Sequence, residues 1–341
     1  SDETKSARIL PAPRGFALLM VLGPGLVWCG EFIGSGEVIL ATRNGAIFGI
    51  GLLWVPMLAT FAKFWIGLGG AHYTVTTGEG MVDMMARVPG PKNWVVWPVF
   101  IVQIIAGAFS TGALATVASY LLHYFVPGIS EFILGWVLVA CIIGITWTGK
   151  FAPLKQSMLL LVLLKMIGTF IVAASTWPGI GPVITNMIGF HAPSPADWAV
   201  EQGLVTKNIA IEILPLLGWA AGGFASQVWY SYWVIGAGYG ATSGRGWGKP
   251  ADEAALRAMT VEDAKQLRGW RSVVTADAST ALIIGITVTS AFLIAGAGVL
   301  GPLHIAPNDK TIATELSRVV GEHWGKWAGD LFVLAALAAM F

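Results

Sequence analysis

Long runs of apolar residues, separated by polar connections, are the main feature of this 341-residue sequence. Eight runs approach or exceed the roughly 20 residues that a helix needs to cross a bilayer core. They cover residues 15–42, 46–70, 94–121, 132–149, 154–176, 208–240, 272–300 and 327–341. Each is expected to be a transmembrane helix, because a helix satisfies its own backbone hydrogen bonds in lipid. The pattern therefore predicts an all-α membrane protein.

Glycines interrupt the first and the sixth run near the middle. The first run contains GEFIGSGEV, with the triplet that starts at Gly34, and the sixth contains WAAGGFASQ, with Gly222 and Gly223. Each glycine weakens a helix by ~1 kcal/mol relative to alanine. Broken first and sixth helices are typical of transporters built from inverted repeats of five helices, which bind substrate at the unwound backbone. The alternative is that the small residues only let helices pack closely.

The predicted repeats give the domain organisation. We expect a cytoplasmic tail over 1–14, a first repeat over 15–176, an extracellular loop over 177–207 and an incomplete second repeat over 208–341. The first run is too long for the apolar part of a signal peptide, and no cleavage site follows it. The eighth run stops at Phe341 within apolar sequence, so we expect that the end of this span and further spans are missing.

Lys and Arg in the connections predict the orientation. With the N-terminus in the cytoplasm, the inner segments hold 13 of these cations and the outer segments hold 5. Positive residues accumulate in cytoplasmic loops, so we expect a multi-pass plasma-membrane protein with its N-terminus inside. In the inner loop 241–271, ADEAALRAM and VEDAKQLRGW are expected to be short surface helices, whereas 177–207 has the composition of a plain connector.

The composition excludes several classes of protein. Hydrophobic residues make up 55% of the chain, the mean hydropathy is +0.71, and 11% of residues are charged. Soluble domains carry about 25% charged residues, so a soluble enzyme is excluded. A disordered chain is also excluded, because disorder needs low hydrophobicity and high charge. The net charge of +1 offers no attraction for nucleic acid. Cys29 and Cys141 lie in apolar runs, where we expect buried thiols rather than a disulfide or a metal site.

Glu37 directly follows the first interruption. A carboxylate at the centre of a transmembrane helix costs ~2.5 kcal/mol or more, so such residues usually face a cavity and bind or relay an ion. Glu31, one and a half turns earlier, is a second candidate. The alternative for both is an acid that is protonated or paired between helices. Glu212 is expected to lie at the outer mouth of the transport pathway or to pack between helices. Asp277 is expected to be a solvated acid near the inner end of its span.

Oxygen donors dominate both interruptions, and no Cys, His or Met lies at either. The donors are the side chains of Ser35, Glu37, Ser226 and Gln227 and the carbonyls near Gly34 and Gly222. Sulfur and imidazole select transition metals, whereas carboxylate and carbonyl oxygens suit Mg²⁺ and Ca²⁺. Mg²⁺ usually keeps several waters, for which the small residues leave room. The residues suggest a hard cation, with ammonium-bearing substrates as an open alternative.

Several motifs, in order from Gly23 onward, resemble the Nramp family of divalent-metal transporters. GPGLVWCGEFIGSGEVILAT is similar to the first helix of that family, which reads GPG…DPGN…AT. GLLWVPMLATFAK and TVTTGEGMVDMMARVPGP resemble its second helix and the following loop, and GDLFVLAALAA resembles its eighth helix. The resemblance covers essentially the whole chain. It implies the LeuT-type fold, with inverted repeats and broken first and sixth helices.

The departures from the family pattern affect its metal ligands. The Asp, Pro and Asn of DPGN become Gly34, Ser35 and Glu37. In the sixth helix, the family pattern A-x-x-M-P-H places its Ala, Met, Pro and His on Gly222, Ala225, Ser226 and Gln227. A register one residue different would put Phe224 at the Met position. The resemblance thus implies ion-binding residues Gly34, Ser35, Glu37, Gly222, Ala225, Ser226 and Gln227, with metal contacts at Glu37, Gly222 and Gln227.

These losses resemble the Nramp-related magnesium transporter branch. The soft Met ligand is absent, and the third-helix acids of proton-coupled members align with the neutral Gln103 and Ser110. The resemblance implies inward transport of a largely hydrated Mg²⁺, with Mn²⁺ as a second substrate, without proton coupling. No cofactor is expected. The expected partners are the metal ion and the lipid bilayer, with no nucleic acid, and we expect a monomer.

Other functions remain as alternatives. A proton-coupled Mn²⁺ or Fe²⁺ importer would require the missing acids and sulfur, and an amino-acid transporter of the same fold would suit the GSG break but not Glu37 beside it. We do not expect an enzyme, because His72, His123, His191, His304 and His323 lie in or near connections without catalytic spacing. A sensor that has kept the fold but lost transport is a further alternative.

Overall fold

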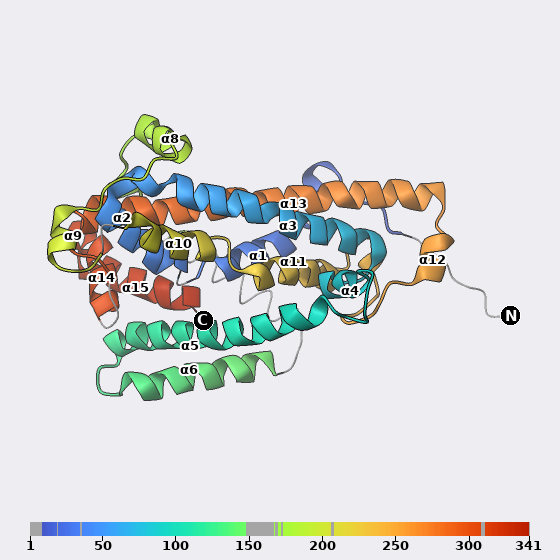
Figure 1. Cartoon of the computed structure of the whole chain (residues 1–341), viewed down its shortest axis with the longest axis horizontal. Coiled ribbons are helices and arrows are strands. Elements are labelled where there is room, and N and C mark those ends of the chain that lie inside the picture. The colour runs from blue at the N-terminus through green and yellow to red at the C-terminus, as the bar shows by residue number, and fades with distance from the viewer. Residues whose placement is uncertain are drawn as a thin grey trace. The chain divides into compact units, whose positions relative to one another are not determined.

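The computed structural model describes residues 9–18, 20–34, 36–147, 167, 170–171, 173–205, 208–307 and 311–340. Within these residues the regular elements are helices, as the sequence predicts (Figure 1). They are η1 (Gly15–Leu18), α1 (Pro24–Phe32), η2 (Gly36–Ala41), α2 (Thr42–Phe48), η3 (Gly49–Leu52), α3 (Trp54–Thr77), α4 (Met81–Ala86), α5 (Val96–Phe125), α6 (Glu131–Thr146), α8 (Ile180–Ile188), α9 (Asp197–Glu201), α10 (Ile209–Trp219), α11 (Phe224–Ala237), η4 (Gly240–Thr242), α12 (Glu253–Arg257), α13 (Val261–Ala295), η5 (Gly296–Leu300), α14 (Ile312–Trp324) and α15 (Lys326–Met340). Segments η2 and η5 are π-helical.

The chain forms two compact units. Unit 1 comprises Ser1–Cys29, Ala62–Ala106 and Gly223–Ile283, and unit 2 comprises Gly30–Phe61, Gly107–Gly222 and Ile284–Phe341. Helices α1, α3, α5 and α13 contribute residues to both units. These units are not the two repeats that the sequence predicts, and the repeats stay a prediction.

The third, fourth and eighth predicted spans correspond to α5, α6 and α15. The fifth, 154–176, lies almost entirely outside the described residues. Among the residues that are described, three helical stretches are long and apolar enough to cross a membrane, and a fourth counts if a pair bent by 97° is one span. They are Val96–Phe125, Ile209–Ala237 and Val261–Leu300, with Val38–Leu52 plus Trp54–Thr77 as the bent pair. The first and sixth predicted spans are divided into shorter helices.

The predicted limits of the second span, 46–70, are wrong. Residues 46–48 belong to α2, and the chain then turns through η3, with Gly49 at a φ of 63°, before α3 begins at Trp54. Hydropathy does not mark this boundary, because the residues on both sides of the turn are apolar and buried. Leu52 and Leu53, for example, are completely buried.

The loop predicted over 241–271 is also partly wrong. The first expected surface helix corresponds to α12, but VEDAKQLRGW is the beginning of α13 rather than a separate helix. Helix α13 runs for 35 residues, from polar into apolar sequence, without a break. Hydropathy locates only the start of the apolar part of α13, near residue 272. The backbone hydrogen bonds of the helix already begin in the polar part, so the helix is longer than the predicted span. The expected plain connector over 177–207 contains α8 and α9.

Two glycines let α2 and η5 pack closely in unit 2. A Cβ on Gly296 would lie 2.8 Å from the carbonyl carbon of Thr42, and a Cβ on Gly45 would lie 2.8 Å from that of Leu293. The contact is therefore reciprocal: Gly296 of η5 faces the backbone of α2, and Gly45 of α2 faces the backbone at the end of α13 and the start of η5. Small residues at such crossings allow the van der Waals packing that stabilises membrane helix pairs.

We expect Gly296→Ala to destabilise the protein by roughly 2 kcal/mol, because the added methyl overlaps backbone that cannot rotate away. The matched control is Gly107→Ala in α5, where nothing lies within 4 Å of the new Cβ. Thermal unfolding in detergent measures both variants. Equal midpoints for Gly296→Ala and Gly107→Ala would contradict this account of the crossing.

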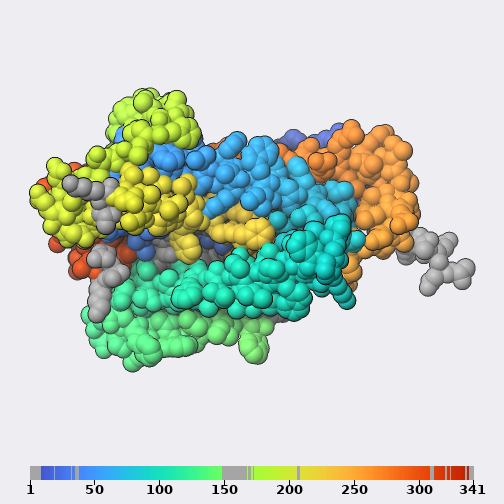
Figure 2. Space-filling view, in the orientation of Figure 1, coloured from blue at the N-terminus to red at the C-terminus, as the bar shows by residue number. Residues whose placement is uncertain are grey.

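Helix α6 carries many large apolar side chains on its surface. Phe132 is 76% exposed and Trp136 is 62% exposed, and Figure 2 shows α6 at the surface of its unit. Several large exposed apolar side chains on one helix are typical of contact with lipid or another protein. Cys141, on the same helix, is exposed, so its predicted burial is wrong, whereas Cys29 is buried as expected. An apolar run facing lipid has the same hydropathy as a buried one.

Candidate functional site

The first helical interruption lies in unit 2. Helix α1 ends at Phe32, Ile33 is buried, and Gly34 lies in a bend before η2 begins at Gly36. The backbone N–H of Val38 donates to the carbonyl of Gly34 at 3.1 Å, which links the bend to the new helix. Glu37 has its backbone in η2. The predicted ligand Ser35 and the side chain of Glu37 lie outside the described residues.

The second interruption follows α10, which packs against η2 within unit 2. Its backbone is left-handed at two successive residues, with φ at 60° for Ala221 and 65° for Gly222. A left-handed conformation is ordinary for glycine but costs roughly 1 kcal/mol or more for alanine. Ala221 is nevertheless buried, at 3% exposure. The N–H of Gly222 donates to the carbonyl of Trp219 at 2.8 Å, so the reversal is a defined turn.

The remaining predicted ligands occupy the first turn of α11 in unit 1. Ala225 is half-buried, while Ser226 and Gln227 are 3% and 1% exposed. The amide nitrogen of Gln227 donates to the carbonyl of Gly223 at 3.5 Å. A Cβ on Gly67 would lie 3.0 Å from Gln227 Oε1 and 2.8 Å from the Trp28 ring. Gly67 therefore leaves space for the Gln227 amide beside Trp28.

The predicted ligands thus fall into two sets. Gly34, the Glu37 backbone and Gly222 belong to unit 2, and Ala225, Ser226 and Gln227 belong to unit 1. Within each set the residues lie at the interruptions that the sequence indicates. Among the described residues, no three His, Cys, Asp or Glu side chains are close enough together to hold a metal ion.

Asp277 has a role that sequence analysis missed. It is 1% exposed rather than solvated, and its carboxylate accepts hydrogen bonds from the N–H of Gly23 at 3.1 Å and of Gly25 at 2.6 Å. The Tyr230 hydroxyl also donates to it, at 3.0 Å. The Tyr230 ring stacks on Trp28 with centroids 4.4 Å apart. One carboxylate therefore fixes the start of α1 against α11 and α13 in unit 1; the only sequence signal was an acid at the edge of an apolar run.

A second buried carboxylate, Glu79, follows α3. Its side chain accepts hydrogen bonds from the Arg87 guanidinium at 2.5 and 2.9 Å, from the Ala251 N–H at 2.5 Å and from the Tyr73 hydroxyl. Arg87 also donates to Glu253 at 3.0 Å. The network joins the end of α3, the residue after α4 and the segment before α12 within unit 1. Its sequence signal is the acid in TTGEG, which alone does not identify the partners.

The partners of Glu79 change its titration. Burial raises the pKa of Glu79, but hydrogen bonds from Arg87, Tyr73 and Ala251 outweigh this effect and hold the pKa below its ordinary value of 4.5. Hydrogen bonds to Glu79 and Glu253 raise the pKa of Arg87. A carboxyl whose pKa is lower in the folded state stabilises the fold above its unfolded pKa, and this stabilisation is lost as the pH falls through the folded-state pKa.

We expect Glu79→Gln to lower the stability at neutral pH by about 2 kcal/mol, because Arg87 and the Ala251 N–H lose a charged acceptor. The difference between wild type and variant should shrink as the pH falls below 4.5, because the carboxyl is then protonated in the unfolded state before it is protonated in the folded state, where its pKa is lower. Thermal unfolding between pH 7 and pH 3.5 measures it. Glu253→Gln, which removes only the more exposed partner of Arg87, is the control and should have a small effect. A pH-independent difference for Glu79→Gln would refute this linkage.

Comparison with known sequences finds only partial relatives, and no family model matches the chain. An uncharacterized protein of Pasteurella multocida is 24% identical over 217 residues, which are 63% of this chain and 47% of that protein. The divalent metal cation transporter MntH of Yersinia enterocolitica is 31% identical over 80 residues, which are 23% of this chain and 20% of the transporter. This chain therefore spans less than half the length of these curated relatives.

Solved structures match over nearly the whole chain. The manganese transporter of Eremococcus coleocola, in complex with an aromatic bis-isothiourea substituted compound, has a TM-score of 0.65 and 14% identity, covering 99% of this chain and 66% of that one. A mutant of the same transporter has a TM-score of 0.63 and 15% identity over the same shares. At this identity the likeness shows the fold alone. The chain has the all-helical fold of the Eremococcus coleocola manganese transporter.

Proposed function

We propose that this chain belongs to a divalent-metal transporter of the Nramp family that carries Mg²⁺ inward as a largely hydrated ion, with Mn²⁺ as a second substrate. The observation that carries the proposal is the shared fold with a manganese transporter over 99% of the chain. Local identity of 31% to a divalent metal cation transporter supports the same class of substrate. The long apolar helices suit a multi-pass membrane protein.

The proposed ligands lie at the two helical interruptions. The structure supports their choice within each unit: the chain is not helical at Gly34, it reverses at Gly222, and Ser226 and Gln227 are buried polar residues beside the second reversal. Non-helical backbone at membrane depth occurs where it is buried in protein or lines a cavity. In our proposal Glu37 supplies the negative charge, directly or through a water, and Gly222 and Gln227 contribute oxygens.

Selectivity for Mg²⁺ is proposed from the chemistry of the donors. Ala225 and Gln227 stand where the family pattern has Met and His, so sulfur and imidazole are replaced by a methyl group and an amide oxygen. Removing soft ligands removes the preference for transition metals. Small residues leave room for the waters that Mg²⁺ retains.

We also propose that transport is not coupled to protons and that the N-terminus is cytoplasmic. Gln103 and Ser110, which align with third-helix acids of coupled members, do not titrate. The membrane potential then drives entry, and it supplies ~2.3 kcal/mol per charge per 100 mV. A divalent cation gains about 4.6 kcal/mol for the same potential.

Uptake into proteoliposomes tests the proposal. The full-length protein is reconstituted at a clamped potential, with indicators for Mg²⁺, Mn²⁺ and pH inside the vesicles. We expect saturable, potential-dependent Mg²⁺ uptake, competition by Mn²⁺, and no acidification. No uptake of either metal would refute divalent-metal transport.

A proton-coupled manganese importer is the second candidate, because the relatives of known activity are manganese or divalent-metal transporters by name. It predicts Mn²⁺ uptake with stoichiometric acidification and no Mg²⁺ uptake in the same assay. That outcome would replace the magnesium proposal while keeping the class of transporter.

Ala225→Met sharpens the selectivity test. Restoring a thioether at this position should lower the ratio of Mg²⁺ to Mn²⁺ uptake, because sulfur binds Mn²⁺ better than Mg²⁺. Ala108→Met, at an exposed position of α5, is the matched control and should leave the ratio unchanged. An unchanged ratio in Ala225→Met would remove Ala225 from the proposed site.

A further inference from the structure

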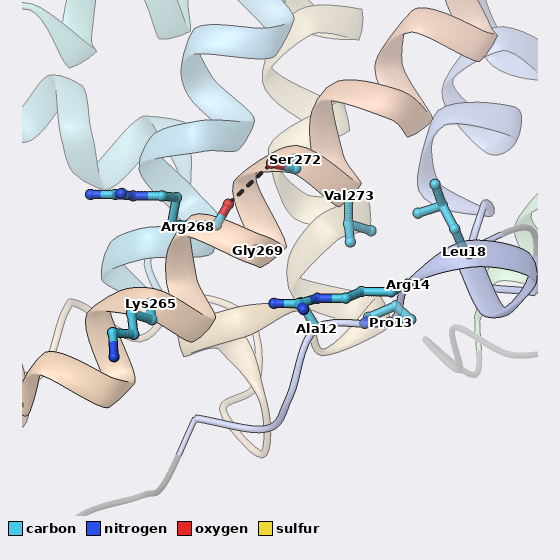
Figure 3. Close-up of a pocket in the computed structure, with 10 residues that line it drawn as sticks. Ala12, Pro13, Arg14, Leu18, Lys265, Arg268, Gly269, Ser272 and Val273 are labelled. Carbon is cyan, nitrogen blue, oxygen red and sulfur yellow. Dashed lines mark hydrogen bonds between the residues drawn. The ribbon is translucent and has the colours of Figure 1, made fainter.

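A pocket of about 540 Å³ lies in unit 1, between the N-terminal segment and α13. Figure 3 shows Arg14 running alongside α13, with Lys265 and Arg268 projecting from the helix on one side of the view. Ser272 lies one turn beyond Arg268, and its hydroxyl donates to the Arg268 carbonyl at 3.3 Å. The pocket is thus lined by three cations, and it lies away from the proposed transport residues in the sequence.

The N-terminal side of the pocket is held in place by contacts with α13. The Ala12 N–H donates to the Gln266 side chain at 3.3 Å, and the Trp270 indole donates to the Leu10 carbonyl at 2.8 Å. A Cβ on Gly269 would lie 2.8 Å from the Ala12 Cβ, so the backbones approach closely there. Arg14 therefore follows a segment that is packed onto the helix.

The charge in the pocket is largely uncompensated. Lys265 pairs with Glu262 at 3.6 Å, but both side chains are more than 60% exposed, and such pairs contribute little. Neither Arg14 nor Arg268 has an ion pair within 4 Å to another residue in the described part of the chain. The residues that line the pocket therefore carry three cations, with one carboxylate nearby.

The pocket also lies where the sequence of α13 changes from charged to apolar residues. Helix α13 carries Lys265, Arg268 and Arg271 in its N-terminal part and is mainly apolar beyond residue 272, although it includes Asp277. On the other side, Phe16 and Met20 follow Arg14 and are 82% and 81% exposed. Cations beside exposed apolar residues, at the end of an apolar helix, are typical of the membrane interface.

We propose that this pocket binds the phosphate headgroup of an anionic phospholipid. The three cations contact the phosphate, and Phe16 and Met20 contact the acyl chains. The occupant is a lipid rather than a free anion because apolar Leu18 and Val273 also line the pocket, and the exposed Phe16 and Met20 follow Arg14 closely in the sequence. A soluble phosphate does not contact such residues. This inference does not depend on which ion the protein transports.

Native mass spectrometry of the full-length protein in mixed phosphatidylglycerol and phosphatidylcholine micelles tests the proposal. The variant Arg14→Gln/Lys265→Gln/Arg268→Gln should retain phosphatidylglycerol at least about tenfold less well than wild type, since each cation near an anionic headgroup contributes to binding. Phosphatidylcholine retention should not change. The matched control is Lys92→Gln/Lys249→Gln/Arg257→Gln, which removes three exposed cations elsewhere in the same unit.

A second arm distinguishes the lipid from free phosphate. We expect short-chain phosphatidylglycerol to raise the thermal midpoint of wild type, inorganic phosphate at the same concentration to raise it much less, and Phe16→Ser/Met20→Ser to weaken only the lipid effect. Equal protection by inorganic phosphate would overturn the lipid assignment. Equal phosphatidylglycerol retention by the pocket variant and by the control would overturn the site.

Discussion

Replacing Glu37 by Gln is expected to reduce Mg²⁺ uptake by about 10- to 100-fold while the protein stays folded. The reason is that the proposed site has one carboxylate, and losing a charged partner removes about 1.5–3 kcal/mol of interaction. The amide keeps the size of the side chain, so the loss reports on charge. Initial uptake rates in proteoliposomes at a clamped potential provide the measurement.

Two further variants make the Glu37 result specific. Glu37→Asp keeps the charge and should retain part of the uptake. Glu201→Gln removes an exposed carboxylate from α9, in the same unit, and should leave uptake unchanged. Wild-type uptake by Glu37→Gln would show that the central charge lies elsewhere, even if divalent-metal transport itself is demonstrated.

Replacing Asp277 by Ala is expected to lower the stability of the fold by about 3 kcal/mol or more. The substitution leaves the Gly23 N–H and the Gly25 N–H without their acceptor in a buried place, and the Tyr230 hydroxyl keeps only the Val274 carbonyl, at 3.3 Å. Each unsatisfied buried donor costs about 1–3 kcal/mol. We expect little folded protein in size-exclusion chromatography, and a large fall in the thermal midpoint of whatever remains.

The Asp277 network also predicts a graded series. Tyr230→Phe removes one donor and leaves the carboxylate with both backbone partners, so it should cost about 1 kcal/mol. Glu262→Ala, an exposed acid at the start of the same helix, is the control and should have almost no effect. If Asp277→Ala unfolds at the same temperature as Glu262→Ala, the carboxylate does not hold α1 in place.

Hydropathy was sufficient to predict that the chain is all-helical and to locate several helices. The runs that become α5 and α6 are mostly apolar and are bounded by polar or turn residues, so their limits could be placed within a few residues. The glycines at 34, 222 and 223 indicated where regular helix stops, because glycine is the residue most tolerant of left-handed backbone. At Gly222 the backbone is left-handed, with a φ of 65°.

The same signal failed where neighbouring segments have equal hydropathy. The turn at Gly49–Leu52 separates two apolar helices, so it was hidden within one predicted span. Cys141 is exposed on an apolar helix, although its sequence surroundings are those of a buried residue. Hydropathy measures the preference of a side chain for an apolar environment, and it does not distinguish the protein interior from lipid.

The sequence by itself determined that the chain is helical and apolar, and that regular helix stops near Gly34 and Gly222. Only the tertiary structure decided what Asp277 and Glu79 do, because their partners Gly23, Gly25 and Ala251 are more than 170 residues away along the chain. It likewise decided that Arg14 meets Lys265 and Arg268 around one pocket. The residue type of a carboxylate or a cation does not reveal whether the group is solvated or buried. Its role depends on the donors and acceptors that folding places around it.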